Sequence, residues 1–187
     1  FQWLFGAGAL IIALGALLRT WATAYLKSDV VHDTALHSDR LVADGPYRYL
    51  RNPLYTGVFL MNVGLGLLAS RLGYVFIVCA ALIFYCRLLL REEAELLATQ
   101  GESYARYRQA VPCLWPSLTP RLPAGGLKPE WGQAFLGEIT IWAVALAVLS
   151  YALTLRAVMI YGIIGLAMIW GVLAQARLRR KRAKENS

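Results

Sequence analysis

The sequence predicts an all-α polytopic membrane protein with about five transmembrane helices. Of its 187 residues, 58% are hydrophobic, against roughly 45–50% in soluble domains. The apolar residues form blocks close to the ~20 residues that span a bilayer, and most charged residues lie between or after these blocks. This pattern disfavours a small soluble globule. Membrane topology also accounts for the net charge of +8, so we expect no nucleic-acid partner, which would need a basic face on a soluble fold.

One single span followed by two helical hairpins accounts for the apolar blocks. The expected spans are residues 3–25, 54–70, 73–90, 133–155 and 158–176. Connections inside the two hairpins are too short for anything except tight turns. We expect one membrane domain over residues 1–187, with a motif-bearing core at about 27–120, a C-terminal hairpin at 133–176 and a basic tail at 177–187.

The positive charges predict the orientation. All of the 19 Lys and Arg residues except Arg71 and Arg156, which lie at the hairpin tips, are on one side of the expected spans. The positive-inside rule then places the N-terminus outside and the loops and C-terminus in the cytoplasm. A secretory signal peptide cleaved near Ala22-Thr23-Ala24 is the alternative for the first block, but no basic segment precedes it. The chain begins at Phe1, so a further span upstream is left open.

Cysteine and histidine spacing predicts no metal site. Cys79 and Cys86 are seven residues apart on an expected span, which suits packing on one helix face. The two histidines, His32 and His37, lack the neighbouring ligands of zinc motifs.

Two polar stretches hold most of the chemical information. In the first, Gly45-Pro46 predicts a turn and Pro53 suits the first turn of the second span. Between these corners Arg48 and Arg51 are three residues apart, so they would share one side of a helix.

The second stretch follows the third span. We expect that span to continue as an amphipathic helix to about residue 97, with Glu92 facing a cation from protein or ligand at the bilayer edge. A short helix carrying Tyr104, Tyr107 and Arg108 would end at Pro112, and a stiff Pro-rich segment would follow at 116–129.

Carboxylates and tyrosine faces together suit a cofactor that has a cationic centre and a nucleoside end. S-adenosyl-L-methionine is such a molecule. Methyl transfer depends mainly on positioning, so it requires no nucleophilic triad.

These segments resemble the isoprenylcysteine carboxyl methyltransferase and phospholipid methyltransferase superfamily. Its pattern is roughly LVxxGPYxxxRHPxYxG, a hydrophobic hairpin, EExxL and GxxYxxYxxxVP. The corresponding segments are DRLVADGPYRYLRNPLYTG at 39–57, REEAEL at 91–96 and GESYARYRQAVP at 101–112. The resemblance implies an integral membrane enzyme that takes S-adenosyl-L-methionine from the cytosol and a lipophilic acceptor from the bilayer.

The resemblance also implies roles for individual residues. Arg51 and Arg87 would be acceptor-side or catalytic cations beside Glu92, and Glu93 would brace Glu92. The implied cofactor contacts are His32, Asp39, Arg40, Leu41, Val42, Tyr47, Asn52, Pro53, Leu54, Tyr55, Glu92 and Glu93.

This chain departs from the family pattern at three points. Asn52 replaces the family histidine, and an amide does not titrate. The arginine before the double glutamate has two candidates, Arg87 and Arg91. The C-terminal hairpin is additional. Three of its glycines suit close helix packing, and a wall of the acceptor tunnel or an oligomer contact are alternatives. These glycines are Gly162, Gly165 and Gly171.

Several functions stay open at this point. The acceptor is an isoprenylcysteine-like carboxylate or another lipid, and an aminolipid N-methyltransferase is one alternative. An NADPH-dependent isoprenoid or sterol reductase, with Arg106 and Arg108 on the 2′-phosphate, is another. A non-enzymatic scaffold or small transporter is disfavoured because we expect no broken helix at the membrane midplane, and charges within the spans only at their ends, apart from Glu138.

Overall fold

The computed structural model describes residues 2–32 and 43–185, and these residues form helices and loops without a strand. The helices are α1 (Gln2–His32), the 3₁₀ helix η1 (Gly45–Arg48), α2 (Pro53–Gly66), α3 (Arg71–Gln100), α4 (Glu102–Ala110), α5 (Trp131–Gly137), α6 (Ile139–Thr154) and α7 (Ala157–Glu185). The all-α prediction is confirmed.

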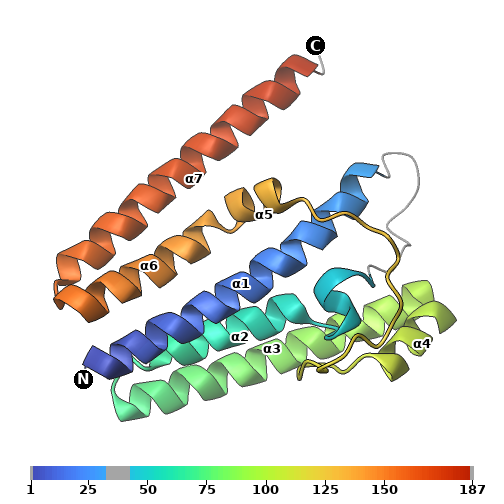
Figure 1. The fold of residues 1–187 in the computed structure, drawn as a ribbon, viewed down its shortest axis with the longest axis horizontal. Coiled ribbons are helices and arrows are strands. Elements are labelled where there is room, and N and C mark those ends of the chain that lie inside the picture. The colour runs from blue at the N-terminus through green and yellow to red at the C-terminus, as the bar shows by residue number, and fades with distance from the viewer. Residues whose placement is uncertain (1, 33–42, 186–187) are drawn as a thin grey trace.

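The first helix is the centre of the arrangement. α1 lies between α2 on one side and α6 on the other, with α3 beyond α2 and α7 beyond α6 (Figure 1). α4 folds back at the end of α3, and the segment between α4 and α5 curves past η1 on its way to α5. The polar segments therefore gather at one end of the bundle.

Glycines allow α1 and α2 to approach closely. A Cβ added to Gly15 would lie 2.5 Å from the carbonyl oxygen of Gly57, and one added to Gly8 would lie 2.7 Å from that of Gly64. The spacing of seven residues in both helices places these two contacts on one face of an antiparallel pair. By contrast, a Cβ added to Gly162, Gly165 or Gly171 would meet no atom of the described chain within 4 Å. The expectation that these later glycines serve close packing within the chain is thus wrong.

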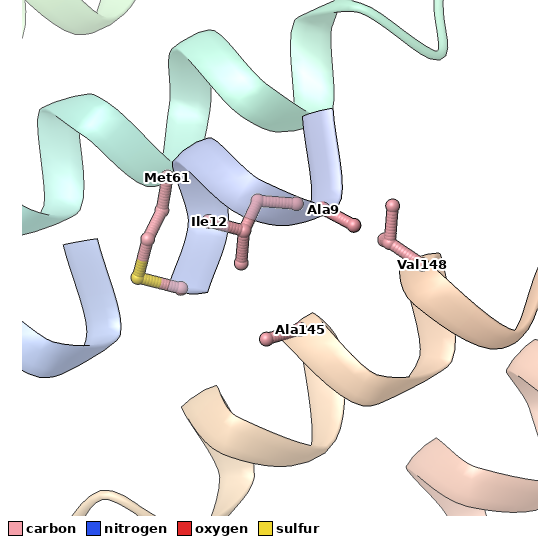
Figure 2. Packing of buried hydrophobic residues seen from close by; sticks show 5 residues of the cluster. All are labelled: Ala9, Ile12, Met61, Ala145 and Val148. Carbon is pink, nitrogen blue, oxygen red and sulfur yellow. The ribbon is translucent and has the colours of Figure 1, made fainter. Parts of the chain in front are cut away.

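Small and branched side chains from three helices fill the core. Figure 2 shows Ile12 of α1 between Met61 of α2 and Val148 of α6, with Ala9 and Ala145 beside them. Ile12 is fully buried. Because α1 supplies the middle of this cluster, it joins the motif-bearing helices to the C-terminal hairpin.

The apolar helices belong to an integral membrane protein. Only 11% of the most apolar stretch of α3 is buried inside the protein, and the apolar part of α1 is 25 residues long. α2 has 14 residues, about 21 Å, which is less than the ~30 Å hydrocarbon core. By length and composition the described helices supply two spans, or three if α5 and α6 are one bent span. This is fewer than the five expected.

The expected fourth span is broken. α5 and α6 meet at an angle of 62°, and the break falls at Glu138, which is 6% exposed. The Glu138 carboxylate receives hydrogen bonds from Arg19 Nε and Nη2 at 3.0 Å each, and from Thr23 Oγ1 at 2.9 Å. The prediction of a continuous helix is wrong because a buried carboxylate at this position has its partners on α1, beside the bend.

Candidate functional site

The site region is built around the short segment between α1 and α2. Gly45 begins η1 with a φ of +56°, and a Cβ there would lie 2.4 Å from the Tyr25 ring, so this position requires glycine. Pro46 and Pro53 are both buried at the two corners. The turn predicted at Gly45-Pro46 and the helix start predicted at Pro53 are both present.

Backbone hydrogen bonds hold the segment from residue 113 to 129, which we call the strap, against η1. Ser117 N donates to Tyr49 O at 3.0 Å and Arg121 N donates to Arg48 O at 2.8 Å. The Asp44 carboxylate accepts from the backbone N–H groups of Gly125 and Leu127 at 2.7 and 2.9 Å. The strap is therefore tied along most of its length, and it places Cys113 beside the start of α2.

Glu93 is the centre of a buried polar cluster. Its side chain is 6% exposed and lies 3.4 Å from Arg51 Nη1 and 3.4 Å from Arg108 Nε. Asn52 Nδ2 donates to Glu93 Oε1 at 3.4 Å, and the Cys113 thiol lies 3.7 Å from the same oxygen. One carboxylate is thus shared by two guanidinium groups and an amide, so the cluster carries net positive charge.

Arg51 retains unused hydrogen-bonding capacity. Its side chain is 9% exposed, and neither Nε nor Nη1 makes a hydrogen bond. A buried guanidinium that leaves donors unpaired is costly unless a ligand or water takes them. Because an arginine fork matches a carboxylate or phosphate with two parallel bonds, this arrangement is suited to an anion.

Glu92 directly precedes Glu93 on α3, about 100° around the helix, and is exposed. Tyr55 Oη donates a hydrogen bond to Glu92 Oε1, and the Tyr55 ring contacts Tyr85 with ring centroids 6.1 Å apart. A carboxylate next to two aromatic rings is suited to a cation. Since Tyr55 follows Arg51 by four residues, the anion-suited and cation-suited groups flank the same helix start.

Burial keeps the neighbouring titratable groups neutral. Desolvation raises the pKa of the Tyr107 phenol above its ordinary value, and its hydroxyl donates to Tyr47 O at 2.9 Å. Burial, followed by the charge of Glu93, raises the pKa of the Cys113 thiol. Tyr107 and Cys113 are therefore protonated near neutral pH.

The structure brings together some of the predicted site residues. Arg51, Asn52 and Glu93 meet in one cluster, and Tyr55 meets Glu92. Pro53 is buried at the start of α2 with the half-buried Leu54 after it.

Other predicted residues lie apart from this cluster. Tyr47, within η1, is 8% exposed, and its hydroxyl has no hydrogen-bond partner among the described residues. Arg87 and Arg91 are exposed on α3, and neither pairs with a carboxylate among the residues that the structure describes. Asp39, Arg40, Leu41 and Val42 lie outside the described residues, and the His32 side chain is likewise not described.

The sequence alone does not predict that Arg108 and Cys113 belong to the Glu93 cluster. It suggests Arg108 only as a ligand for a 2′-phosphate, and it suggests no role for Cys113. The helical spacing of Tyr104, Tyr107 and Arg108 could have indicated that α4 packs against the site, since Tyr104 and Tyr107 are both buried. No local pattern indicated that the residue after Pro112 returns to Asn52.

The chain is similar to known methyltransferases. The family model described as Phospholipid methyltransferase matches residues 3–101. A protein-S-isoprenylcysteine O-methyltransferase of Schizosaccharomyces pombe is 32% identical over 107 residues, covering 54% of this chain and 44% of that protein. A second one, from Arabidopsis thaliana, is 26% identical, covering 59% of this chain and 58% of that protein.

The similarity extends to a differently named group. The cobalt-zinc-cadmium resistance protein CzcN of Cupriavidus metallidurans is 27% identical over 112 residues, covering 60% of this chain and 49% of that protein. The chain thus spans about half the length of the curated relatives it matches. No solved structure matches it at a significant level.

Proposed function

Because the chain belongs to the phospholipid methyltransferase family, we propose that it is a membrane methyltransferase that uses S-adenosyl-L-methionine and a lipophilic acceptor from the bilayer. The observation that carries this proposal is the pairing of an anion-suited group, Arg51, with a cation-suited group, Tyr55 with Glu92, at one helix start. Both lie where the apolar part of α3 ends, so a water-soluble donor and a membrane-dissolved acceptor would meet there.

The residues present fit the methyl donor. A sulfonium needs a carboxylate or aromatic face, which Glu92 and Tyr55 provide. When bound, the donor would supply an electrophilic methyl carbon next to a cationic sulfur. Placement in line with the acceptor is the main requirement of that chemistry, and the first turn of α2, fixed by Pro53 and the strap, provides a rigid support for it.

Arg51 is proposed to act on the acceptor side. Its Nε, which makes no hydrogen bond within the described residues, would donate to an anionic acceptor such as a carboxylate, next to the Nη1 that lies 3.4 Å from Glu93. An aminolipid needs no cation near its reacting nitrogen, although its phosphate is also a ligand for a guanidinium. This distinction favours a carboxylate acceptor and leaves an aminolipid as the second candidate, which the family's own description supports. Arg87, which is exposed on α3, is proposed as a second acceptor-side cation that engages only with the acceptor present.

The reductase alternative has less support. Arg108, one of the two cations available for a 2′-phosphate, lies 3.4 Å from the buried Glu93. The other, Arg106, lies 3.9 Å from Glu102 on the same helix, and both of those side chains are largely exposed. Neither cation is free of a carboxylate.

The proposed topology places the site in the cytoplasm. The positive-inside rule applied to the 19 Lys and Arg residues gives an outside N-terminus and a cytoplasmic C-terminus. The cofactor would then approach from the side where α4 and the strap lie.

Titration of the purified full chain in detergent with both cofactors tests the class of enzyme. We expect heat of binding with S-adenosyl-L-methionine and none with NADPH. Binding of NADPH alone would overturn the proposal in favour of a reductase, and binding of neither by folded protein would favour the scaffold alternative.

A further inference from the structure

The strap exposes two large apolar side chains that nothing in the described chain covers. Trp115 is 85% exposed and Leu118 is 101% exposed. Their exposure does not come from a loose loop, because the backbone around them is tied down: Leu114 O accepts from Thr56 Oγ1 at 3.4 Å, and Ser117 N donates to Tyr49 O. The two side chains are thus presented outward from a fixed backbone.

The hydrogen bonds also relate this part of the strap to the apolar surface of α3. Thr56 lies in the first turn of α2 and follows Tyr55, whose hydroxyl bonds Glu92 on α3. On α3 exposed apolar side chains run from Leu72 to Phe84 and return at Leu90. The exposed Arg87 lies between them, and from Arg91 onward the helix is mostly charged, with Leu97 also exposed. Glu92 and its partner Tyr55 therefore lie where α3 changes from apolar to charged, and Trp115 directly follows Leu114, whose carbonyl oxygen is 3.4 Å from Thr56 Oγ1.

The side-chain types fit the region where hydrocarbon meets headgroups. Tryptophan is enriched at membrane interfaces because its ring is apolar and its indole N–H needs a polar partner. Leu118 adds apolar surface next to it, Pro116 between them limits backbone freedom, and the exposed Arg121 follows at a position suited to a lipid phosphate. The strap curves past η1 before it reaches α5 (Figure 1).

We propose that Trp115 and Leu118 insert into the headgroup and upper acyl region of the bilayer and anchor the strap to the membrane beside the polar cluster. The partner is the lipid surface itself. Because Cys113, two residues before Trp115, contacts Asn52 and Glu93, the anchor fixes the strap at the site end. This proposal rests on the membrane location of the chain and not on its enzymatic activity.

Spin labels on the full chain in phosphatidylcholine vesicles test the depth directly. In a background with the three native cysteines replaced by serine, labels are attached to Trp115→Cys or Leu118→Cys, and collision with oxygen is compared with collision with a water-soluble nickel chelate. Ser103→Cys on α4 is the aqueous reference and Leu82→Cys on α3 the acyl reference; both positions are exposed.

We expect the oxygen-to-nickel accessibility ratio at 115 and 118 to exceed that at 103 several-fold and to fall below that at 82. A ratio equal to that at 103 in both variants would overturn the proposal by placing the strap in water. Low accessibility to both reagents would also overturn it, because it would indicate a protein partner or a second copy over this surface. The use of two label positions keeps the test valid if one variant does not fold.

Discussion

Glu93 supplies the carboxylate of the polar cluster. Two arginines, an asparagine and a thiol surround its buried side chain. Removing one member of a buried ion pair leaves an uncompensated charge, which costs more than the pair contributes. Glu93 thus acts as the group that allows Arg51 to remain charged beneath the surface.

Substitution of Glu93 tests this role. We expect Glu93→Gln to lower the free energy of unfolding by about 3–5 kcal/mol, measured by thermal or denaturant unfolding in detergent. The exposed Glu95→Gln on the same helix is the matched control and should change it little. Equal stability of the two variants would mean that Arg51 does not depend on this carboxylate.

Glu92 is the residue through which the proposed donor site is tested. Glu92→Gln keeps the size of the side chain and removes its charge, so we expect affinity for S-adenosyl-L-methionine to fall about 10–100-fold, as for the loss of one charge-assisted interaction. Isothermal titration measures this, again with Glu95→Gln as control. Retained affinity in Glu92→Gln, with unchanged helicity, would remove Glu92 from the donor site.

At this scale the sequence supplied the residue types and the structure supplied their grouping. The resemblance implied separate roles for Arg51, Asn52 and Glu93, with Glu93 bracing Glu92, whereas the partners of Glu93 in the structure are Arg51, Arg108 and Asn52. The sequence does not predict which of Glu92 and Glu93 is buried. Adjacent helix positions differ by about 100°, and only the packing of α3 decides which of the two faces inward. Cys113 joins the cluster only through the tertiary path of the strap, which no local pattern encodes.

At the scale of elements, the contact between α1 and α2 depends on the absence of side chains. We expect Gly15→Ala to destabilise the protein by about 1–3 kcal/mol, because its Cβ would overlap the Gly57 carbonyl oxygen. Gly6→Ala on the same helix has open space around it and should be neutral or stabilising. Thermal unfolding in detergent compares the two, and similar behaviour would show that the helices are not in close contact.

An ion pair lies at the break between α5 and α6, and a double-mutant cycle measures the coupling between its two members. Arg19 and Glu138 form two hydrogen bonds of 3.0 Å across α1 and the break. We expect Arg19→Met and Glu138→Gln each to cost about 3–5 kcal/mol and the double variant to cost less than their sum. Strict additivity in unfolding measurements would mean that the two side chains do not interact.

Helix positions were predictable from the apolar blocks, whereas breaks and lengths were not. Hydropathy averages over a window, so a single Glu138 does not interrupt the block from 133 to 155. Its partner Arg19 is 119 residues away in sequence, and only the folded arrangement of α1 against α6 brings them together. α2 likewise ends at Gly66, short of the predicted residue 70.

For the molecule as a whole, the arrangement places polar chemistry at one end of an apolar bundle. α1 connects the two halves: its glycines contact α2 and its Arg19 and Thr23 hold the break before α6. The strap then returns from α4 past η1 to the end of α1, where Glu130 N donates to Ala24 O at 2.9 Å. The C-terminal hairpin therefore shares the core with the motif-bearing helices.

Methyl transfer in membranes tests the central claim most directly. Membranes from cells that produce the chain are incubated with methyl-labelled S-adenosyl-L-methionine, and label is measured in the material extracted by organic solvent. We predict incorporation well above that of membranes carrying Glu92→Gln at equal protein level. Equal incorporation in the two preparations, with both proteins folded and inserted, would contradict the assignment of this site to methyl transfer.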